Sequence, residues 1–331
     1  MAWLRRPSGA ALRALFLAAL LIAVAGCGGG SRPSGPRAAV YATGLPTVSA
    51  FALDARGRLW ATTSAASDHR KDGVYLIPPA GARPVKVIGG VHGPLGLTWY
   101  RGTLYVASLG RVEAFSGLHG TRFAHRETIL REPSGHGWNN GIVALPNGRL
   151  AMGISSACDH CKPTSKWSAS IVTFRPDGSD VRLFAKHIRA PYGLARYPGS
   201  SDLLVSMNQR DDLGARTPGD WLARVGAGQD WSFPECYGQP GTACAGVPAP
   251  IAVLDKHAAA GGVAVSGRTA FVAEWQAGRV LAVSLTGTRA TATPLLTGIR
   301  NPLAMATTPD GALFVGDWGT GKIYRVASAG K

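Results

Sequence analysis

The sequence predicts an all-β domain that forms a six-bladed β-propeller, and three observations carry this prediction. A phrase made of an apolar strand, a glycine-containing turn and a second apolar strand recurs along the chain. Most copies follow the previous one after about 45 residues, the period and content of a propeller blade. Glycine (44 residues) and proline (22 residues) are abundant, as expected where short strands alternate with turns. The six copies are Val48–Thr62, Pro94–Ala107, Asn140–Gly153, Pro191–Ser206, Gly262–Ala273 and Pro302–Gly316.

Each blade is predicted to hold four antiparallel strands, the first of which lines a central channel. The turns between first and second strands are expected near Gly57, Gly102, Gly148, Gly199, Gly267 and Gly311. In the third blade the strands are expected at 142–145, 150–154, 170–174 and 181–185. The sixth blade shows three strands, at 303–307, 313–316 and 322–326. Residues 38–43 are expected to supply its fourth strand, because closing the ring in this way removes two exposed sheet edges.

The first 27 residues are predicted to be an export signal outside the fold. Arg5 and Arg6 form a basic start, and the apolar stretch 14–25 is too short to span a bilayer comfortably. The stretch ends in Val24-Ala25-Gly26-Cys27, which resembles a bacterial lipobox, so Cys27 is predicted to carry lipid. The alternative is an uncleaved transmembrane anchor.

Residues 28–37 are rich in Gly, Ser and Pro, so we expect a flexible tether there. A single propeller domain is then expected at 38–331. The protein is therefore expected to be exported and lipid-anchored to a bacterial membrane, on its periplasmic or extracellular face.

Four cysteines remain when Cys27 is set apart, an even number that suits disulfides in an oxidising compartment. Their positions favour two local pairs, Cys158 with Cys161 and Cys236 with Cys244. A redox or metal site at the first pair is the alternative. The sequence contains neither a second CxxC nor a CxxCH haem motif to support this alternative.

The formal net charge of +16 stays strongly positive after Arg5, Arg6 and Arg13 leave with the signal. Such a charge indicates adhesion to anionic lipid or wall polymer, together with solubility. The arginines are scattered, and the sequence shows no basic run or recognition helix. A nucleic-acid partner is therefore not expected.

Two sets of loops are expected to open on one face of the propeller: those that enter the first strands and those that join second to third strands. Five of the six entering loops carry a cation or a histidine, which suits an anionic ligand. These residues are His92, His136, Arg189, Lys256 with His257, and Arg300. The second set carries 208–212, 274–276, Asp317 and Trp318. The alternative is that all are solvated turn residues.

Three segments are longer than a blade requires, and long structured loops in compact domains are usually functional. They are 155–168, 208–220 and 226–260.

A longer pattern runs through the middle of the chain. His136-Gly137-Trp138-Asn139-Asn140 precedes the turn 145–150, and the pieces RPDG, IRAPYGL, NQRDDLG and GQDWSFPECYG follow in order up to Gly238. This order resembles the glucose/sorbosone dehydrogenase family, six-bladed propellers of the soluble aldose sugar dehydrogenase type. The family uses pyrroloquinoline quinone (PQQ) and Ca²⁺. The stretch 189–238 is its most specific part, because Pro-Asp-Gly turns occur in many propellers.

The resemblance implies a PQQ- and calcium-dependent sugar dehydrogenase that moves hydride from a sugar hydroxyl carbon to the quinone. With the export signal and lipobox, the expected protein is an exported, lipid-anchored form of this enzyme. His136 is implied as the base that takes the hydroxyl proton, and Arg189 as the cation facing the quinone. The implied Ca²⁺ contacts are oxygens, which Ca²⁺ prefers. They come from Gln209 and Arg210, with Asp211 or Asp212.

Other residues are implied to contact the cofactor. PQQ carries three carboxylates, and Arg300 would bind one of them. Trp138 or Trp275 would pack on its planar face. The remaining implied contacts are Asn139, His257 and Gln276. A sugar substrate and an electron acceptor complete the expected partners.

Three departures from the family pattern leave other functions open. Gly137 stands where the spacing places the catalytic histidine, Ala190 replaces an asparagine, and Gln276 replaces a lysine. A non-catalytic propeller that binds sugar or protein is the first alternative. A calcium-dependent lactonase-type hydrolase is the second, and it needs acidic residues converging on a metal. Among the glutamates, Glu274 alone lies at an expected mouth position.

Overall fold

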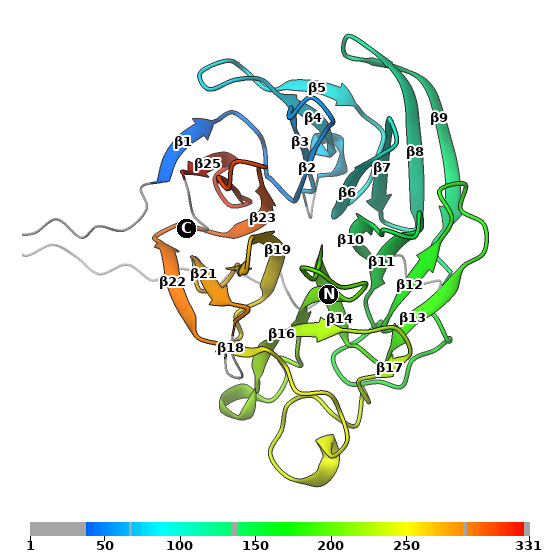
Figure 1. Cartoon of the computed structure of the whole chain (residues 1–331), viewed down its shortest axis with the longest axis vertical. Coiled ribbons are helices and arrows are strands. Elements are labelled where there is room, and N and C mark those ends of the chain that lie inside the picture. The colour runs from blue at the N-terminus through cyan, green and yellow to red at the C-terminus, as the bar shows by residue number, and fades with distance from the viewer. Residues whose placement is uncertain (1–37, 66–67, 134–137, 287–289, 328–331) are drawn as a thin grey trace, which may run out of the picture. The chain divides into compact units, whose positions relative to one another are not determined.

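The computed structural model describes residues 38–65, 68–133, 138–286 and 290–327. The predictions for residues 1–37, including lipidation of Cys27, lie outside this part of the chain. Six sheets surround a central channel, and the first strand of each sheet packs against the first strands of its two neighbours (Figure 1). The predicted all-β six-bladed propeller is therefore confirmed.

Blades 1 to 3 take up the first half of the ring. Blade 1 comprises β2 (Ala50–Leu53), β3 (Leu59–Thr63), β4 (Gly73–Ile77) and β5 (Val85–Ile88). Blade 2 comprises β6 (Gly96–Tyr100), β7 (Thr103–Ser108), β8 (Arg111–His119) and β9 (Arg122–Arg131). Blade 3 comprises β10 (Asn139–Ala144), β11 (Leu150–Ile154), β12 (Ser170–Phe174), β13 (Arg182–Lys186) and the short β17 (Gln229–Asp230).

Blades 4 to 6 complete the ring. Blade 4 comprises β14 (Ala190–Arg196), β15 (Leu203–Asn208), β16 (Gly219–Val225) and β18 (Ala252–Lys256). Blade 5 comprises β19 (Ala260–Ser266), β20 (Thr269–Glu274), β21 (Arg279–Ser284) and β22 (Ala292–Thr297). Blade 6 comprises β23 (Pro302–Thr307), β24 (Leu313–Asp317), β25 (Lys322–Val326) and β1 (Ala38–Ala42).

The N-terminal strand closes the ring as predicted. β1 pairs antiparallel with β25, so that Ala38 lies opposite Val326. This pairing completes blade 6 with a strand from the other end of the chain, and it leaves neither β1 nor β25 as a free edge on the paired side.

The predicted turn glycines all adopt positive φ, between 56° and 83°. A left-handed residue is what a tight strand–turn–strand connection requires, and glycine adopts it without a steric penalty. They are Gly57, Gly102, Gly148, Gly199, Gly267 and Gly311.

The inner strands approach one another closely because glycines stand where neighbouring blades meet. A Cβ on Gly193 would lie 2.5 Å from the carbonyl oxygen of Gly261, and one on Gly262 would lie 2.6 Å from that of Leu303. Gly96 and Gly141 face the next blade in the same way. These glycines are required by packing of the ring rather than by backbone conformation.

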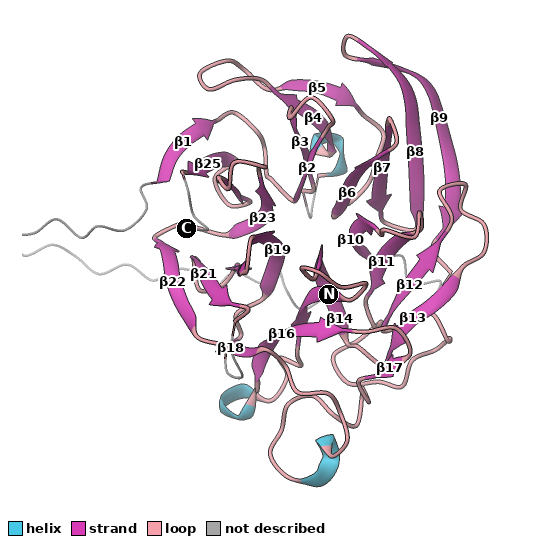
Figure 2. Ribbon diagram, viewed as in Figure 1, coloured by secondary structure: helices cyan, strands magenta, loops and turns pink. Residues whose placement is uncertain are grey.

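Burial decreases from the second strand of a blade to its outer edge. Every residue of β15 is buried, whereas β9 is mostly exposed. The only helical elements in the described residues are single 3₁₀ turns (Figure 2), namely η1 (His69–Lys71), η2 (Gly214–Arg216) and η3 (Thr242–Cys244).

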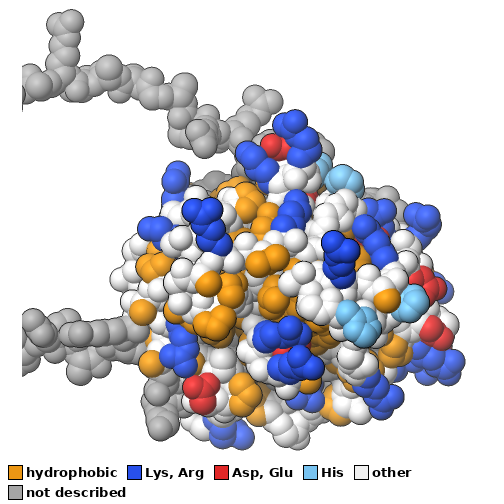
Figure 3. Space-filling model, turned by 90° about the horizontal axis from the view of Figure 1, so that it is seen from above, with side chains coloured by type: hydrophobic (Ala, Val, Ile, Leu, Met, Phe, Trp, Pro, Cys, Tyr) orange, Lys and Arg blue, Asp and Glu red, His pale blue; other side chains and the backbone are white. Residues whose placement is uncertain are grey.

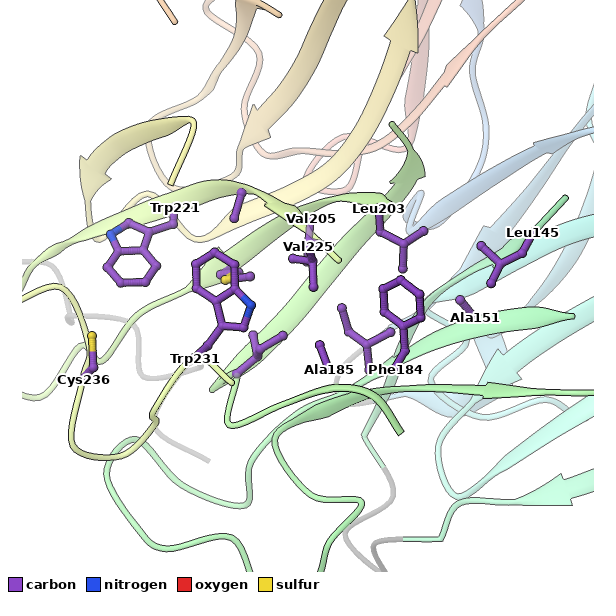
Figure 4. Packing of buried hydrophobic residues seen from close by; sticks show 14 residues of the cluster. Leu145, Ala151, Phe184, Ala185, Leu203, Val205, Trp221, Val225, Trp231 and Cys236 are labelled. Atoms are coloured by element: carbon purple, nitrogen blue, oxygen red, sulfur yellow. The ribbon is translucent and has the colours of Figure 1, made fainter. Parts of the chain in front are cut away.

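The segment 226–251 adds a feature that the repeat does not predict. It leaves β16 and forms β17, which pairs parallel to β13 of blade 3. Trp231 follows β17 and is 2% exposed in the core between blades 3 and 4. Its ring lies 6.0 Å from that of Trp221 between the ring centroids (Figure 4). Trp231 thus anchors the insertion to both blades.

The surface carries its positive charge in a dispersed way. Lys and Arg side chains are spread over the face seen in Figure 3, between hydrophobic and uncharged groups, with few acidic ones. Among the described residues, no helix has the length and apolar character needed to cross a membrane.

Candidate functional site

The strand register brings the two predicted sets of loops to one face. Ala190 at the start of β14 pairs with Asn208 at the end of β15, and Ala260 at the start of β19 pairs with Glu274 at the end of β20. The loops that enter first strands therefore lie beside the loops that leave second strands. We call this face the mouth.

The long insertions of blades 3 and 4 meet at the mouth. Tyr237, from the insertion 226–251, lies 6.0 Å from the ring of His160 in the loop between β11 and β12. The guanidinium of Arg210, in the loop after β15, lies 4.7 Å from the Tyr237 ring. The insertion thus runs from the opposite face, along blade 3, to cover this part of the mouth.

Arg189 is the buried cation of this region. It precedes β14, is 8% exposed, and donates from Nη1 to the carbonyl oxygen of Asn208 at 3.2 Å. Its Nη2 pairs with the carboxylate of Asp159. Burial lowers the pKa of Arg189, and the nearby Asp211 and Asp220 oppose this effect. Its Nε is buried without a hydrogen-bond partner among the described residues.

Asp220 is a buried acid beside Arg189 that the sequence did not single out. Its Oδ1 accepts from the amide of Gln209 at 2.8 Å, and its Oδ2 accepts from the amide of Ala260 at 2.9 Å. Burial raises the pKa of Asp220 to about 7, and repulsion from Asp211 adds to the rise. Its protonation therefore changes near neutral pH.

The predicted metal residues occupy the loop after β15. Gln209 and Arg210 are buried, and both carboxylate oxygens of Asp212 accept from Arg210, at 2.7 and 2.8 Å. This pairing lowers the pKa of Asp212. Asp211 lies 3.3 Å from Nδ1 of His257, so these two predicted residues are brought together.

Blades 5 and 6 contribute a half-buried aromatic pair to the mouth. The rings of Trp275 and Trp318 lie 5.7 Å apart, and Nε1 of Trp318 donates to the carbonyl oxygen of Ser64 in blade 1 at 2.8 Å. Gln276 and Arg300 are exposed beside this pair.

Asp317 and Glu274 shape the loops of blades 5 and 6. Asp317 is buried and accepts hydrogen bonds from the amides of Arg300 and Asn301. Glu274 is fully buried and accepts from the amide of Asp255 while pairing with Arg279. Both acids are therefore engaged in holding loops.

The residues before β10 are placed differently from one another. Trp138 is 46% exposed, whereas Asn139 is 1% exposed. Nδ2 of Asn139 donates to the carbonyl oxygens of Ser108 and Arg111, at 2.9 and 3.2 Å, which ties blade 3 to blade 2. His136 lies outside the described residues.

Both predicted disulfides are formed. Cys158 is bonded to Cys161, and Cys236 to Cys244. The first closes the loop that carries Asp159, and the second closes the loop that carries Tyr237. Disulfides of this kind indicate an oxidising compartment outside the cytoplasm.

Two cavities lie toward the opposite face. One of about 860 Å³ is lined by the first strands of all six blades and by the turn 197–201. A second of about 450 Å³ lies at the turns near Gly57 and Gly267. Of the predicted site residues in the described part of the chain, none lines either cavity. The mouth and these cavities are therefore separate features.

The chemistry of the mouth fits an anion and a hard cation together. The unpartnered Nε of Arg189 can donate to an anion, as can the exposed Arg300. Carboxylates outnumber arginines around Arg189, which suits a divalent cation. The loop 208–212 contains no His, Cys, Asp or Glu triple close enough to hold a metal within the described chain. A cation there would need the carbonyl oxygens of Gln209 and Arg210, as the sequence suggested.

Sequence reasoning missed the partners of its own site residues. Asp159 and Asp220 contact or face Arg189 from segments 30 residues before it and 31 after it. The one available signal for Asp220 was its place at the end of a long insertion, directly at the start of a strand. Asp72, which lies between His69 and the loop of His92, carried no such signal.

Comparisons with known proteins bear on the fold. No protein-family model matches the chain, and neither does any curated protein sequence. The PQQ-bound aldose sugar dehydrogenase of Streptomyces coelicolor matches with a TM-score of 0.73 at 20% identity, over 90% of this chain and 99% of that one. The calcium structure of a family AA12 carbohydrate-active enzyme from Trichoderma reesei matches with 0.73 at 16% identity, over 89% and 96%.

The apo-form of the soluble aldose sugar dehydrogenase of Escherichia coli also matches, with a TM-score of 0.69 at 17% identity, over 88% of this chain and 99% of that one. Matches over nearly the whole of each chain cover all six blades. The protein is thus a six-bladed propeller that is similar in structure, at low sequence identity, to PQQ-dependent aldose sugar dehydrogenases.

Proposed function

We propose that this chain is an exported PQQ- and calcium-dependent sugar dehydrogenase, anchored by lipid at Cys27. The resemblance at 136–238 and the fold shared with PQQ-bound aldose sugar dehydrogenase support the activity. The lipobox-like Val24–Cys27 supports the anchor. The two disulfides support export.

The observation that carries the proposal is the buried Arg189 at the mouth. A guanidinium that is 8% exposed and has one N–H without a partner among the described residues is costly unless it serves a ligand. An anionic quinone would accept a hydrogen bond from this N–H and so offset part of the free energy lost by burying it. The buried position also places the cation in a low-dielectric setting, where its effect on developing negative charge is largest.

The balance of charge around Arg189 supports calcium as the companion of an anionic cofactor. Two arginines face a larger set of carboxylates, which leaves an excess of negative charge for a cation to neutralise. The set comprises Arg189 and Arg210 with Asp159, Asp211, Asp212 and Asp220. The carbonyl oxygens of Gln209 and Arg210 and the carboxylate of Asp211 would hold Ca²⁺.

The chain's own residues would bind and orient the reactants. Bound PQQ would supply the hydride acceptor. His136 would take the proton of the sugar hydroxyl, and Arg300 and His257 would bind carboxylates of the cofactor. Trp275 and Trp138 would offer apolar faces to its planar ring.

The departures from the family pattern predict weaker binding of PQQ than the pattern provides. Ala190 offers no side-chain donor, and the exposed Gln276 offers a neutral amide where the pattern has a cation. Each lost polar contact costs about 1–3 kcal/mol when the partner is buried. Saturating PQQ and Ca²⁺ are therefore needed in the test.

The test is reconstitution of the full-length chain with PQQ and Ca²⁺, read as quinone absorbance and as dye reduction with a panel of aldoses. Arg189→Met is expected to weaken PQQ binding about 10- to 100-fold, because charge-assisted hydrogen bonds contribute about 1.5–3 kcal/mol. Arg182→Met is the matched control, since Arg182 lies on the exposed outer strand of the neighbouring blade 3 and pairs with Asp180. It should leave binding unchanged.

Two results would overturn the proposal in favour of other functions. Unchanged quinone absorbance at saturating PQQ and Ca²⁺ would indicate a propeller that binds sugar or protein without catalysis. Hydrolysis of lactones without PQQ would indicate a metal-dependent hydrolase on the same fold.

A further inference from the structure

A second polar cluster lies at the mouth between blades 1 and 2, on loops that the proposed dehydrogenase site does not use. His69 and Asp72 lie between β3 and β4, and His92 precedes β6. One donor atom from each of the three lies within 4.8 Å of the others. Among the described residues, this is the one His, Cys, Asp or Glu triple that is close enough to hold a metal ion.

Asp72 is fixed in place before any ligand binds. It is 1% exposed, and its Oδ1 accepts from the amide of Ala65 at 2.6 Å. Its Oδ2 accepts from the amide of Gly93 in blade 2 at 2.7 Å. Two backbone donors from different blades therefore orient the carboxylate toward the histidines.

The two histidines approach that carboxylate from neighbouring blades. Nδ1 of His69 lies 2.9 Å from Oδ2 of Asp72, and the rings of His69 and His92 lie 5.5 Å apart, edge to face. Backbone hydrogen bonds hold both: the carbonyl of His69 accepts from Asp72, and that of His92 accepts from Leu109. Both side chains are exposed, so their rings can rotate to close on an ion.

We propose that His69, Asp72 and His92 form a binding site for a divalent transition metal, with Zn²⁺ as its natural occupant. Two imidazole nitrogens and one carboxylate are a donor set that suits Zn²⁺ and not Ca²⁺, which prefers oxygen alone. Zinc ligands at about 2.0–2.2 Å in a tetrahedron lie about 3.3 Å apart. The His69–Asp72 pair, at 2.9 Å, is already near that separation.

Three protein ligands leave a fourth position open to water or to an oxygen of a bound molecule. The ion would also join η1 of blade 1 to the loop that enters blade 2, which adds a link across the blade interface.

The neighbouring cations are directed away from the cluster. Arg70 and Lys71 both pair with Asp68, at 2.9 and 3.5 Å, and Nζ of Lys86 donates to the carbonyl oxygen of Arg70. They reduce the attraction for a cation at long range, but none contacts Asp72.

The experiment measures Zn²⁺ binding to the chelator-treated full-length chain by competition with a chromophoric chelator. One equivalent is expected to bind, and a hundredfold excess of Ca²⁺ should not displace it. His69→Gln and His92→Gln should each weaken binding at least tenfold, and the double variant should lose it. Co²⁺ in place of Zn²⁺ should give visible absorption bands in the wild type that the double variant lacks.

His187→Gln is the matched control, because His187 forms a comparable pair with Asp230 at 2.7 Å but belongs to no metal-holding triple in the described chain. It should bind Zn²⁺ like the wild type. Thermal unfolding in chelator should be the same for the wild type and the histidine variants, which separates lost binding from lost fold. Equal Zn²⁺ affinity in the double variant and the wild type, or displacement by Ca²⁺, would overturn the proposal.

Discussion

The two sides of the mouth are built in different ways. On the side of blades 3 and 4, long insertions that each contain a disulfide lie around Arg189. Trp231 anchors one of these insertions in the core. On the side of blades 1, 2 and 6, shorter loops are joined directly by hydrogen bonds, such as those from Gly93 to Asp72 and from Trp318 to Ser64.

The residues around Arg189 therefore depend on inserted loops, whereas the cluster at Asp72 depends on the repeated blade structure. Of the charged residues around Arg189, Asp159, Asp211 and Asp212 lie on inserted loops, so their positions depend on how those loops pack, whereas Asp220 belongs to β16. The cluster at Asp72 is held by backbone amides of the blades themselves. Damage to the insertions should therefore affect one side of the mouth and spare the other.

Trp231→Ala should have the largest effect, because it removes the anchor of the insertion. Truncating a buried Trp costs about 3–5 kcal/mol through lost burial and the cavity left behind, and Trp231 is 2% exposed between two blades. Urea unfolding would measure the loss, and limited proteolysis should show faster cleavage within 232–250. Trp138→Ala, at a 46% exposed position, is the control and should stay within about 0.5 kcal/mol of wild type. Equal losses in the two variants would mean that Trp231 anchors nothing.

Asp220 should give the same side of the mouth a pH-dependent stability. Its folded pKa of about 7 lies above the ordinary aspartate pKa of 3.8, so the folded chain binds a proton that the unfolded chain has released. The stabilising contribution is complete below about pH 4 and is lost as pH rises through 7. From pH 5 to 8 the free energy of unfolding should fall by about 2–3 kcal/mol from this group.

Asp220→Asn should abolish that fall, measured by urea unfolding at both pH values. The control is Asp310→Asn: the pKa of this exposed carboxyl is lowered, so it stays ionised from pH 5 to 8. Its variant should keep the wild-type slope. A wild-type slope in Asp220→Asn would show that another group carries the pH dependence.

Replacing Cys236 and Cys244 together by serine should destabilise the chain by about 2–3 kcal/mol, the chain-entropy value for a loop of this length. The loop carries Tyr237, which covers Arg210, so its release should also raise hydrogen exchange in 208–214. The Cys158–Cys161 disulfide closes a shorter loop, so replacing both of its cysteines by serine should cost less. Identical unfolding midpoints for wild type and the Cys236/Cys244 variant would contradict the expectation.

How much the sequence could predict differs between strands and loops for a physical reason. Strands follow a local pattern, so 170–174 was predicted to the residue and all six turn glycines took the expected conformation. Mouth contacts are non-local. Arg189 could be placed at the mouth by topology, but its pairing with Asp159 depends on how a separate loop folds back. The two-residue β17 has no periodicity to detect and owes its position to Trp231.

Trp318→Phe should have the smallest effect, and it tests the repeat-built side. Phenylalanine keeps an aromatic ring beside Trp275 but loses the Nε1 donor to Ser64, so the expected cost is about 0.5–1.5 kcal/mol. Urea unfolding would measure it, and hydrogen exchange should change near Ser64 while the amides of 208–214 keep their wild-type rates. A cost as large as that of Trp231→Ala, or altered exchange at 208–214, would show that the two sides are coupled through closure of the ring. The two sides of the mouth would then not be stabilised independently of each other.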